Sequence, residues 1–319
     1  TLGDFVAFSF YLTLLSWPMI SLGWVTNLFQ RGAASMERLQ EMFDEEPAIR
    51  DPENPVHIDP VRGSIEFEDV SFAYPGTERP VLRDLSFRVE AGQTAAVVGA
   101  TGSGKSTLAR LIPRMYDVDE GAVRIDGVDV REAPLREVRG AVAAVPQEPF
   151  LFSTRLRSNI ALPAEDGGEP PSDELLDEAL ETARLEETLD VLPEGLDTLL
   201  GERGVNLSGG QKQRATLARA LVQESPILLL DDALSAVDSV TEMEILEGLE
   251  RFIEDRTAVI ISHRVSAVRD ADVILVLEEG ELVESGTHDD LVARGGVYAR
   301  LLERQLLEEE LEESELATG

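Results

Sequence analysis

The chain opens with a long apolar stretch. Residues 5–30, FVAFSFYLTLLSWPMISLGWVTNLFQ, carry no formal charge. At 1.5 Å per residue, a helix of this length would span about 39 Å, more than the roughly 30 Å hydrocarbon core of a bilayer. The pattern predicts a membrane-spanning helix, and the alternative is a buried helix of a soluble protein. Because Arg31 and Arg38 follow directly, the positive-inside rule places the C-terminal end of this helix in the cytoplasm.

The pattern after the apolar stretch changes twice. Residues 31–50 continue as a helix, and the proline- and acid-rich residues 51–63 are interpreted as a linker. Apolar and polar positions then alternate as in half-buried strands at 64–74 and 81–90. Continuously apolar strands are expected at 94–99, 141–145, 227–230, 257–261 and 273–277. Helices are expected from Lys105 and, mainly, at 173–192, 209–224 and 240–254. This alternation predicts an α/β domain with a mostly parallel core sheet.

Two further segments are expected to lie outside the core. The acidic residues 165–174 are interpreted as a loop, and residues 298–316 as an amphipathic, solvated helix that turns into an acidic run. The chain begins at Thr1, within the apolar pattern and without a methionine. We therefore expect it to be the C-terminal part of a larger membrane protein.

The charge of the chain is unusual. It has 62 acidic and 28 basic residues, a net charge of −34, and only Lys105 and Lys212 are lysines. Acid spread over the surface repels phosphate, so nucleic acid is not expected as a partner. It is instead typical of a protein adapted to high salt, where hydrated carboxylates maintain solubility. Cysteine is absent, which excludes disulfides and thiolate metal sites.

The clearest chemical signal is the stretch GATGSGKST at residues 99–107. It matches the pattern G-x-x-x-x-G-K-[ST] between a strand and a helix, the context that a phosphate-binding loop requires. The glycines let the backbone turn tightly so that N–H groups face phosphate oxygens, and the helix N-terminus adds positive charge. Lys105 is expected to reach the β- and γ-phosphates, and the Ser106 hydroxyl to bind Mg²⁺.

The second signal is a pair of carboxylates at the end of an apolar strand. Residues 227–230 are apolar, and Asp231 and Asp232 follow. In P-loop NTPases an acidic residue at this position holds Mg²⁺, which is the role expected of Asp231. Asp232 would then lie near the γ-phosphate, where a carboxylate can orient or deprotonate the attacking water.

The third signal identifies a family. The stretch LSGGQKQR at residues 207–214, together with the phosphate loop and the aspartate pair, resembles the nucleotide-binding domain of ABC transporters. The resemblance covers residues 64–302. It implies a P-loop NTPase fold with a mixed core sheet, an antiparallel β subdomain and an α-helical subdomain that carries the signature. The expected organisation is thus a last transmembrane helix with its extension (1–50), a linker (51–63), the domain (64–302) and an acidic tail (303–319).

The resemblance also implies roles for single residues. Tyr74 matches the aromatic that stacks on adenine, Gln147 the glutamine that senses Mg²⁺ and the membrane domain, and His263 the switch histidine at the γ-phosphate. GERG (201–204) matches the loop that meets the coupling helices of the partner's membrane domain. SAVD (235–238) matches the loop that crosses the dimer interface. The expected catalytic residues are Asp232, His263 and Gln147, and the expected metal ligands are Ser106, Gln147 and Asp231. The expected ATP-binding residues are Tyr74, Gly99, Thr101, Gly102, Ser103, Gly104, Lys105, Ser106, Thr107, Leu207, Ser208, Gly209, Gly210 and Gln211.

The signature implies a partner. Its serine and glycines precede a helix, which makes them a ready anion site. In the family two domains pack head to tail, so Ser208 and Gly210 are expected to act on the ATP held by the partner. The other two histidines are expected to have no such role: His57 is expected to be solvated and His288 to be structural.

One position departs from the family pattern. Most active members carry Glu where this chain has Asp232, whose carboxylate reaches about 1.5 Å less far, and displacements near 1 Å can cost about a hundredfold in rate. Three interpretations remain. The chain is the degenerate-site half of a heterodimer whose partner carries Glu, it forms a homodimer that tolerates Asp, or Asp232 is only a structural acid.

The sequence therefore predicts an ATP- and Mg²⁺-dependent subunit of an exporter in the cell membrane, with its nucleotide-binding domain in the cytoplasm. Expected partners are a second half-transporter, with a heterodimer favoured, and membrane helices upstream of Thr1. Two other classes stay open: a soluble ABC ATPase acting on DNA or in translation, and a regulatory module that binds ATP without useful turnover.

Overall fold

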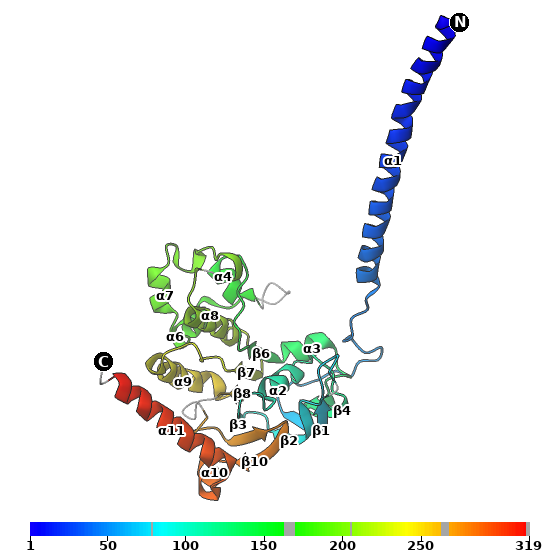
Figure 1. The fold of residues 1–319 in the computed structure, drawn as a ribbon. Helices are drawn as coiled ribbons and strands as arrows, with labels where there is room; N and C mark the ends of the chain where they lie inside the picture. The colour runs from blue at the N-terminus through cyan, green and yellow to red at the C-terminus, as the bar shows by residue number, and fades with distance from the viewer. Residues whose placement is uncertain (78, 163–169, 205, 263–267, 317–319) are drawn as a thin grey trace. The chain divides into compact units, whose positions relative to one another are not determined.

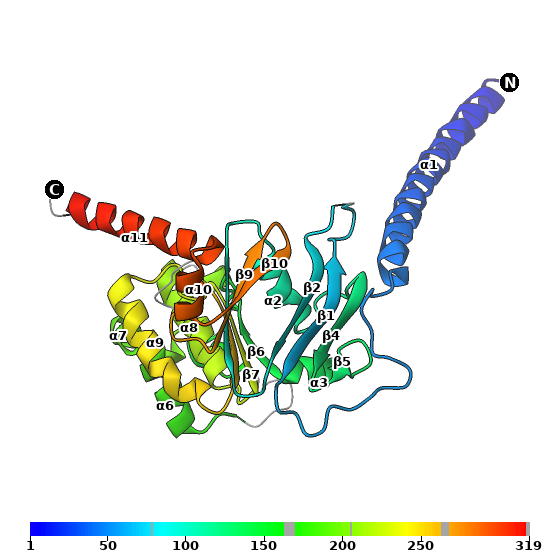
Figure 2. The same cartoon turned by 90° about the horizontal axis from the view of Figure 1, so that it is seen from below.

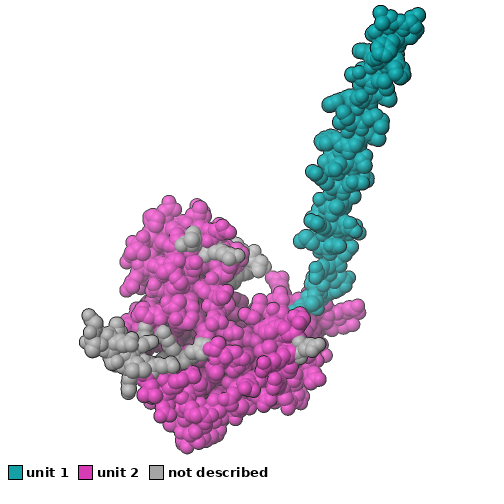
Figure 3. All heavy atoms as spheres, viewed as in Figure 1, with its two compact units in different colours: residues 1–50 teal, residues 51–319 magenta. Residues whose placement is uncertain are grey.

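The computed structural model describes residues 1–77, 79–162, 170–204, 206–262 and 268–316. The chain divides into two compact units, residues 1–50 and residues 51–319 (Figure 3). The first unit contains a single helix, and the second contains both of the sheets that the described residues form.

Helix α1 (Leu2–Asp44) makes up most of the first unit and has no buried side chain. Thr1 caps its N-terminus, and the uncharged residues 5–30 lie entirely within it. Its most apolar window has a mean hydropathy of 1.6, so by length and composition the helix could cross a membrane. Among the described residues it is the one helix that meets this criterion.

A six-stranded sheet forms the centre of the second unit, in the order β10-β9-β3-β8-β7-β6 (Figure 1). Its strands are β3 (Thr94–Gly99), β6 (Val142–Val145), β7 (Ile227–Asp231), β8 (Thr257–Ile261), β9 (Val273–Glu278) and β10 (Glu281–Gly286). The first five run parallel, and β10 pairs antiparallel with β9. The parallel strands are apolar on both sides because both faces of the sheet are covered. The mixed core sheet expected from the resemblance is confirmed.

A smaller antiparallel sheet, in the order β2-β1-β4-β5, lies beside the first one (Figure 2). Its strands are β1 (Ile65–Phe72), β2 (Leu82–Val89), β4 (Glu120–Ile125) and β5 (Val128–Asp129). Helix α2 (Lys105–Leu111) joins the two sheets through one apolar core, in which Leu108 and Leu111 pack with Phe67 of the small sheet and Val97 of the large one. The phosphate loop thus leads directly into this apolar core.

Helices pack on the other face of the large sheet, and one of them begins at the signature (Figure 1). They are α4 (Leu156–Ile160), α6 (Asp173–Thr182), α7 (Glu186–Val191), α8 (Gly209–Leu221) and α9 (Ser239–Ile253), with 3-10 turns at Gly195–Asp197 and Glu202–Gly204. The single helix expected at 173–192 is two helices, because the backbone of Arg184 turns to φ 49° between them. The expected antiparallel and α-helical subdomains are both present.

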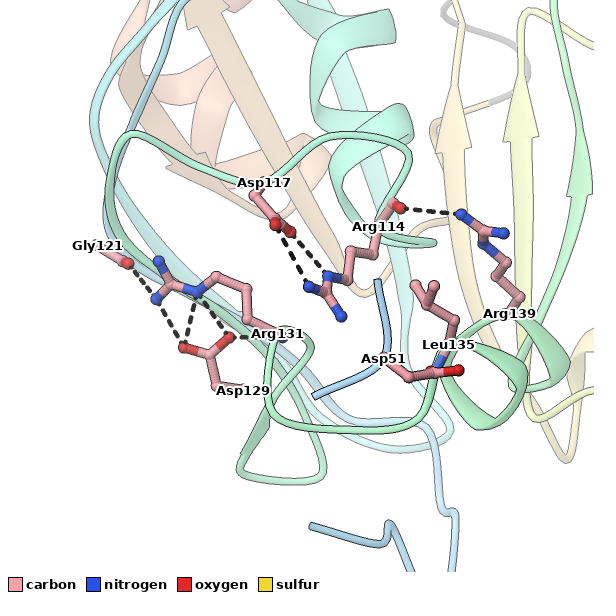
Figure 4. A network of polar contacts seen from close by, with 8 residues as sticks. All are labelled: Asp51, Arg114, Asp117, Gly121, Asp129, Arg131, Leu135 and Arg139. Carbon is pink, nitrogen blue, oxygen red and sulfur yellow. Dashed lines mark hydrogen bonds and ion pairs between the residues drawn. The ribbon is translucent and has the colours of Figure 1, made fainter. Parts of the chain in front are cut away.

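Residues 51–63 are held against the domain by helix α3 (Leu135–Gly140). The amide of Leu135 donates to Asp51 at 2.7 Å (Figure 4), and Glu137 accepts from the Ile58 amide at 3.1 Å and contacts His57 Nδ1 at 2.6 Å. Ile58 is buried. The ring of His57 is largely exposed, as expected, but its Nδ1 has this carboxylate partner. The proline- and acid-rich segment therefore has a defined path along the domain.

The C-terminal part of the chain comprises α10 (His288–Arg294) and α11 (Val297–Leu316). The amides of Val297 and Tyr298 at the start of α11 donate to the Glu284 carboxylate of β10, at 2.7 and 3.0 Å. His288 Nδ1 lies 2.7 Å from the buried Tyr298 hydroxyl. This contact joins α10 to the start of α11, which fits the structural role expected of His288.

Candidate functional site

The phosphate loop and the aspartate pair lie where strands of the large sheet end, at their carboxyl ends. Strands β6, β7 and β8 are parallel, with Val145 opposite Leu230 and Asp231 opposite Ile261. β3 pairs in parallel with β8, so the loop that begins at Gly99 leaves the sheet at the same edge. Ligands of open α/β sheets bind at the carboxyl ends of the strands, which is where these residues gather.

The phosphate loop is shaped by two glycines and a lysine. A Cβ on Gly99 would lie 2.2 Å from the Leu277 carbonyl oxygen, and Gly104, the residue that precedes α2, has φ 104°. Lys105 Nζ donates to the carbonyls of Gly99 at 2.8 Å and Ala100 at 3.1 Å. These two bonds connect the end of the loop to its beginning and stabilise its tight turn. An ammonium has three N–H donors, which leaves one for a ligand oxygen.

The charge on Lys105 sits in a largely buried environment. Burial lowers the pKa of its ammonium, and the carboxylates of Asp232 and Asp231 act in the opposite direction. Each of these three side chains is at most 7% exposed. Buried charges are costly unless they are paired. The lysine can pair with an anion and the two carboxylates with a cation, so the site suits an anion bound together with a cation.

The loop also presents groups that a phosphate chain would satisfy. The Ser103 hydroxyl oxygen is buried and has no hydrogen-bond partner in the part of the chain that the structure describes. Such orphaned polar atoms are rare in folded proteins and call for a ligand or water. A cavity of about 370 Å³ adjoins the loop, and its lining residues are Tyr74, Thr77, Arg79, Pro80, Val81, Arg83, Gly102 and Glu279. A nucleoside fits a cavity of this size, so the residues present fit a nucleotide.

The Ser106 hydroxyl and Asp231 form the candidate metal site. The hydroxyl donates to Asp231 Oδ1 at 3.0 Å. Neighbouring oxygen ligands of an octahedral Mg²⁺ lie about 3 Å apart, because each Mg–O bond is about 2.1 Å. Burial raises the pKa of the Asp231 carboxyl, the Ser106 hydrogen bond lowers it, and the charge of Asp232 raises it. The pair therefore fits Mg²⁺, which prefers one or two protein ligands together with phosphate and water oxygens.

Asp232 is buried and has an unusual backbone. Its φ is 46°, a left-handed conformation that costs a non-glycine residue energy and is typical of functional sites. Its amide donates to the Ile261 carbonyl at 2.9 Å, and its own carbonyl accepts from the Ser235 amide at 3.2 Å. The carboxylate acts on both Lys105 and Asp231, which places it within the phosphate-loop site.

Tyr74 is fixed by the phosphate-loop helix. Its hydroxyl lies 3.0 Å from the Thr107 hydroxyl and accepts from Arg110 at 3.1 Å. Its ring meets the rings of Phe72 and Tyr116 edge-on, at 5.1 and 5.2 Å between centroids. Tyr74 also lines the 370 Å³ cavity, so the structure brings it together with Gly102.

The signature begins helix α8. Ser208 caps the helix reciprocally with Gln211: the Ser208 hydroxyl accepts from the Gln211 amide at 3.2 Å, and the Gln211 side chain accepts from the Ser208 amide at 2.9 Å. Ser208 and Gly209 are exposed, whereas Leu207 is buried. A Cβ on Gly210 would lie 2.8 Å from the Ala236 carbonyl oxygen, so the signature packs against the SAVD loop.

The remaining predicted residues are placed as follows. Gln147 is exposed and lies two residues beyond β6, the strand next to β7. Thr101 is exposed in the phosphate loop. His263 lies outside the described residues. Among the described side chains, no hydrogen bond joins the signature to the phosphate loop of the same chain.

Two polar side chains of α8, the buried Gln213 and the partly buried Arg219, have no role assigned from the sequence. Gln213 bonds to the turn that follows Asp232, and Arg219 donates to the carbonyls of Phe150 and Asn159 in the segment after Gln147. Burial lowers the pKa of Arg219 to about 10. The sequence signal for them is weak, because α8 carries several polar residues and their inward position shows only in the fold.

A family comparison decides the identity of the domain. Residues 82–235 match the model of the family described as "ABC transporter". The domain is an ABC transporter ATPase domain. The matched segment contains the phosphate loop, the signature and the aspartate pair.

The similarity of the chain to known proteins extends beyond residues 82–235. The chain is 42% identical over 307 residues to "Probable multidrug resistance ABC transporter ATP-binding/permease protein YheI" of Bacillus subtilis, covering 96% of the chain and 52% of that protein. It is 46% identical over 299 residues to the "ATP-dependent lipid A-core flippase" of Pseudomonas fluorescens, covering 94% and 49%. A solved bacterial Atm1-family ABC exporter with ATP bound is 40% identical, with a TM-score of 0.82 over 96% of the chain and 53% of the solved one. The chain thus spans about half the length of the relatives it matches.

Proposed function

We propose that this chain is the ATP-binding and ATP-hydrolysing part of an ABC exporter subunit, in which closure of two nucleotide-binding domains drives transport across a membrane. The main support for the proposal is that Lys105, Ser106 and Asp231 lie together at the carboxyl ends of the strands. The capped signature is exposed elsewhere on the domain. The similarity to exporters over 94% or more of the chain supports it.

In this proposal each residue of the loop has a defined task. Backbone N–H groups of residues 102–107 and the third donor of Lys105 bind the β- and γ-phosphates. Ser106 and Asp231, with Gln147, hold Mg²⁺, which when bound neutralises the charge that develops on the phosphates. Tyr74 stacks on adenine in the cavity beside the loop. Asp232 orients the attacking water and accepts its proton, with His263 as the switch residue at the γ-phosphate.

The exposed signature is proposed to complete the ATP site of a second subunit. Ser208 offers its hydroxyl, and Gly209 and Gly210 offer backbone N–H groups at the start of a helix of 13 residues. ATP would then bind the closed dimer better than the open one, and this difference shifts the population towards closure. Hydrolysis removes the γ-phosphate and with it the preference for the closed state.

The aspartate at position 232 favours a heterodimer. A carboxylate withdrawn by about 1.5 Å lowers hydrolysis in the chain's own site while leaving ATP binding intact. The chain would then supply its signature to a competent site on a partner that carries Glu. A homodimer that hydrolyses ATP with Asp232, and an ATP-binding module without turnover, are the alternatives.

Helix α1 is proposed to be the last membrane span, with the ATPase domain on the cytoplasmic side. Its length, its uncharged residues 5–30 and the arginines that follow support this placement. Further spans upstream of Thr1 would provide the substrate pathway. The relatives' names mention multidrug resistance and a lipid A core, so an amphiphilic substrate is proposed.

Copurification tests this proposal. The full-length protein would be expressed with its chromosomal neighbours in a high-salt host, isolated in detergent through a tag on this chain, and analysed by mass spectrometry. An equimolar half-transporter with Glu at its own second acidic position supports the heterodimer. Recovery of this chain with itself alone refutes the heterodimer and leaves the homodimer. An absence of Mg²⁺-dependent ATP hydrolysis in every such preparation contradicts the exporter assignment.

A further inference from the structure

Gln213 is a buried amide that connects the signature helix to the catalytic turn. It lies in α8, two residues after Gln211, and is 2% exposed. Its Nε2 donates to the Ser235 hydroxyl at 2.9 Å, and its Oε1 accepts from the Ala236 amide at 2.8 Å. Nε2 also lies 3.5 Å from the carbonyl oxygen of Asp232, at the outer limit of a hydrogen bond.

The turn that Gln213 holds begins at a strained residue. Asp232 has φ 46°, and the turn from Asp232 to Ser235 is closed by a backbone hydrogen bond of 3.2 Å. A left-handed non-glycine residue persists only where its surroundings enforce that conformation. Gln213 bonds to the turn at both Ser235 and Ala236, so it is one of the groups that enforce it.

The same helix makes a second contact with this segment. The backbone of Ala236 passes close to Gly210, where a Cβ would lie 2.8 Å from the Ala236 carbonyl oxygen. The signature end of α8 and the segment 232–236 therefore form one packed unit. A displacement of α8 cannot leave this segment in place unless the buried Gln213 bonds break, which would leave buried polar groups without partners.

We propose that Gln213 is a positioning residue that couples the signature to the Asp232 turn, so that closure of the signature on the partner's ATP adjusts the chain's own ATP site. This inference rests on the proposed function, because it requires a dimer in which the signature acts in trans. Gln213 touches neither nucleotide nor metal in this proposal, and its effect is transmitted through Ser235 and Ala236.

A purely structural role makes a different prediction. A buried hydrogen bond that only stabilises the fold lowers the melting temperature when it is removed, and the folded fraction keeps its turnover. A positioning role lowers kcat and the cooperativity of ATP hydrolysis in protein that remains folded. The two roles are therefore separated by kinetics measured alongside thermal melting.

The test uses the full-length protein, with its copurifying partner where there is one, in lipid nanodiscs. Gln213→Leu removes all three contacts at similar volume. Gln213→Glu keeps the acceptor for Ala236 but cannot donate to Asp232 or Ser235. The matched control is Ser225→Ala, which removes the 2.8 Å bond from another buried side chain to the Gly140 carbonyl, outside the turn. ATP binding, kcat, KM, the Hill coefficient and melting temperature are measured for each.

We expect both Gln213 variants to lower kcat of this chain's own ATP site at least tenfold with KM for ATP changed less than twofold, since misplacement near 1 Å can cost about a hundredfold. Where a partner carries Glu, its Glu→Gln variant removes the partner's turnover from this measurement. The Hill coefficient should fall towards 1, and Ser225→Ala should change only the melting temperature. Unchanged kcat and Hill coefficient in folded Gln213 variants would overturn the inference while leaving the proposed function intact. A wild type without ATP hydrolysis would overturn both. If Gln213→Leu does not fold, the isosteric Gln213→Glu decides the result.

Discussion

The Ser106 hydroxyl lies 3.0 Å from Asp231 Oδ1, although the two residues are 125 positions apart in the chain. They meet because β3 and β7 both pair in parallel with β8 and end at the same edge. The pair connects the phosphate loop to the acidic strand end and defines where a divalent cation would be held.

Removal of this pair should affect Mg²⁺ more than nucleotide. We expect Ser106→Ala and Asp231→Asn to weaken the Mg²⁺-dependent part of ATP binding at least tenfold, with little change in binding measured in EDTA. Because burial raises the pKa of Asp231, protons should compete with Mg²⁺ at a higher pH than for an exposed aspartate. Calorimetric titrations with and without Mg²⁺ between pH 5 and pH 8 measure both effects. Equal losses in Mg²⁺ and EDTA would argue against a metal role.

The length of the side chain at position 232 should control turnover. Asp232→Glu returns the carboxylate to the usual reach, and a cavity of about 100 Å³ adjoins this residue. We expect kcat to rise, by about tenfold if the native site is degenerate, and Asp232→Asn to bind ATP without hydrolysing it. Single-turnover hydrolysis in the purified complex measures this. No change with either Glu or Asn would support the interpretation of Asp232 as a structural acid.

The two signature glycines should differ in their tolerance of alanine. A Cβ on Gly210 would meet the Ala236 carbonyl oxygen at 2.8 Å, whereas on Gly209 it would make an ordinary 3.7 Å contact with the Ala236 side chain. We expect Gly210→Ala to lower ATP hydrolysis at least ten times more than Gly209→Ala does. Steady-state ATPase assays on both variants provide the comparison, and equal losses would show that the packing against Ala236 is not what limits position 210.

Glu137 should hold residues 51–63 on the domain in a pH-dependent way. The His57 contact and the Ile58 amide hold the pKa of Glu137 below its ordinary value. A lowered folded pKa means that the stabilisation is complete above about pH 4.3, the unfolded value, and is lost as the pH falls further. We expect Glu137→Gln to speed amide exchange of residues 51–63 at pH 7, in hydrogen-exchange mass spectrometry.

The control for this experiment is Glu132→Gln. Glu132 contacts the same segment only through its backbone carbonyl, which accepts from the Val56 amide at 2.8 Å. Its exchange pattern should therefore match the wild type at pH 7. Similar acceleration in both variants would indicate a general loss of acidic charge rather than loss of the Glu137 contacts.

The sequence predicted the elements whose signal is local. Lys105 and Asp231 were found because each follows a continuous apolar strand and belongs to a motif with fixed spacing. Strands β4 and β10 were missed because they contain polar residues and glycines, and they are stabilised by pairing with β1 and β9. The break near Arg184 was also missed, because a positive φ at arginine has no sequence signature.

The contacts that position the site were harder to foresee. Gln213 and Arg219 gain their roles only when α8 packs on segments that lie 19 to 69 residues away in the chain. The path of residues 51–63 along α3 depends on Ile58, an isolated apolar residue in a stretch whose composition indicates a linker. Tertiary packing, rather than local propensity, decides such cases.

The role of Lys105 is tested by measuring Mg²⁺-ATP binding to the full-length protein and to its Lys105→Ala variant, with Arg136→Ala on the exposed side of α3 as the control. We expect saturable binding by the wild type and the control, and at least a hundredfold loss for Lys105→Ala, because a buried charge-assisted contact with phosphate is removed. Equal binding by Lys105→Ala and wild type, or an absence of binding by the wild type, would contradict this role.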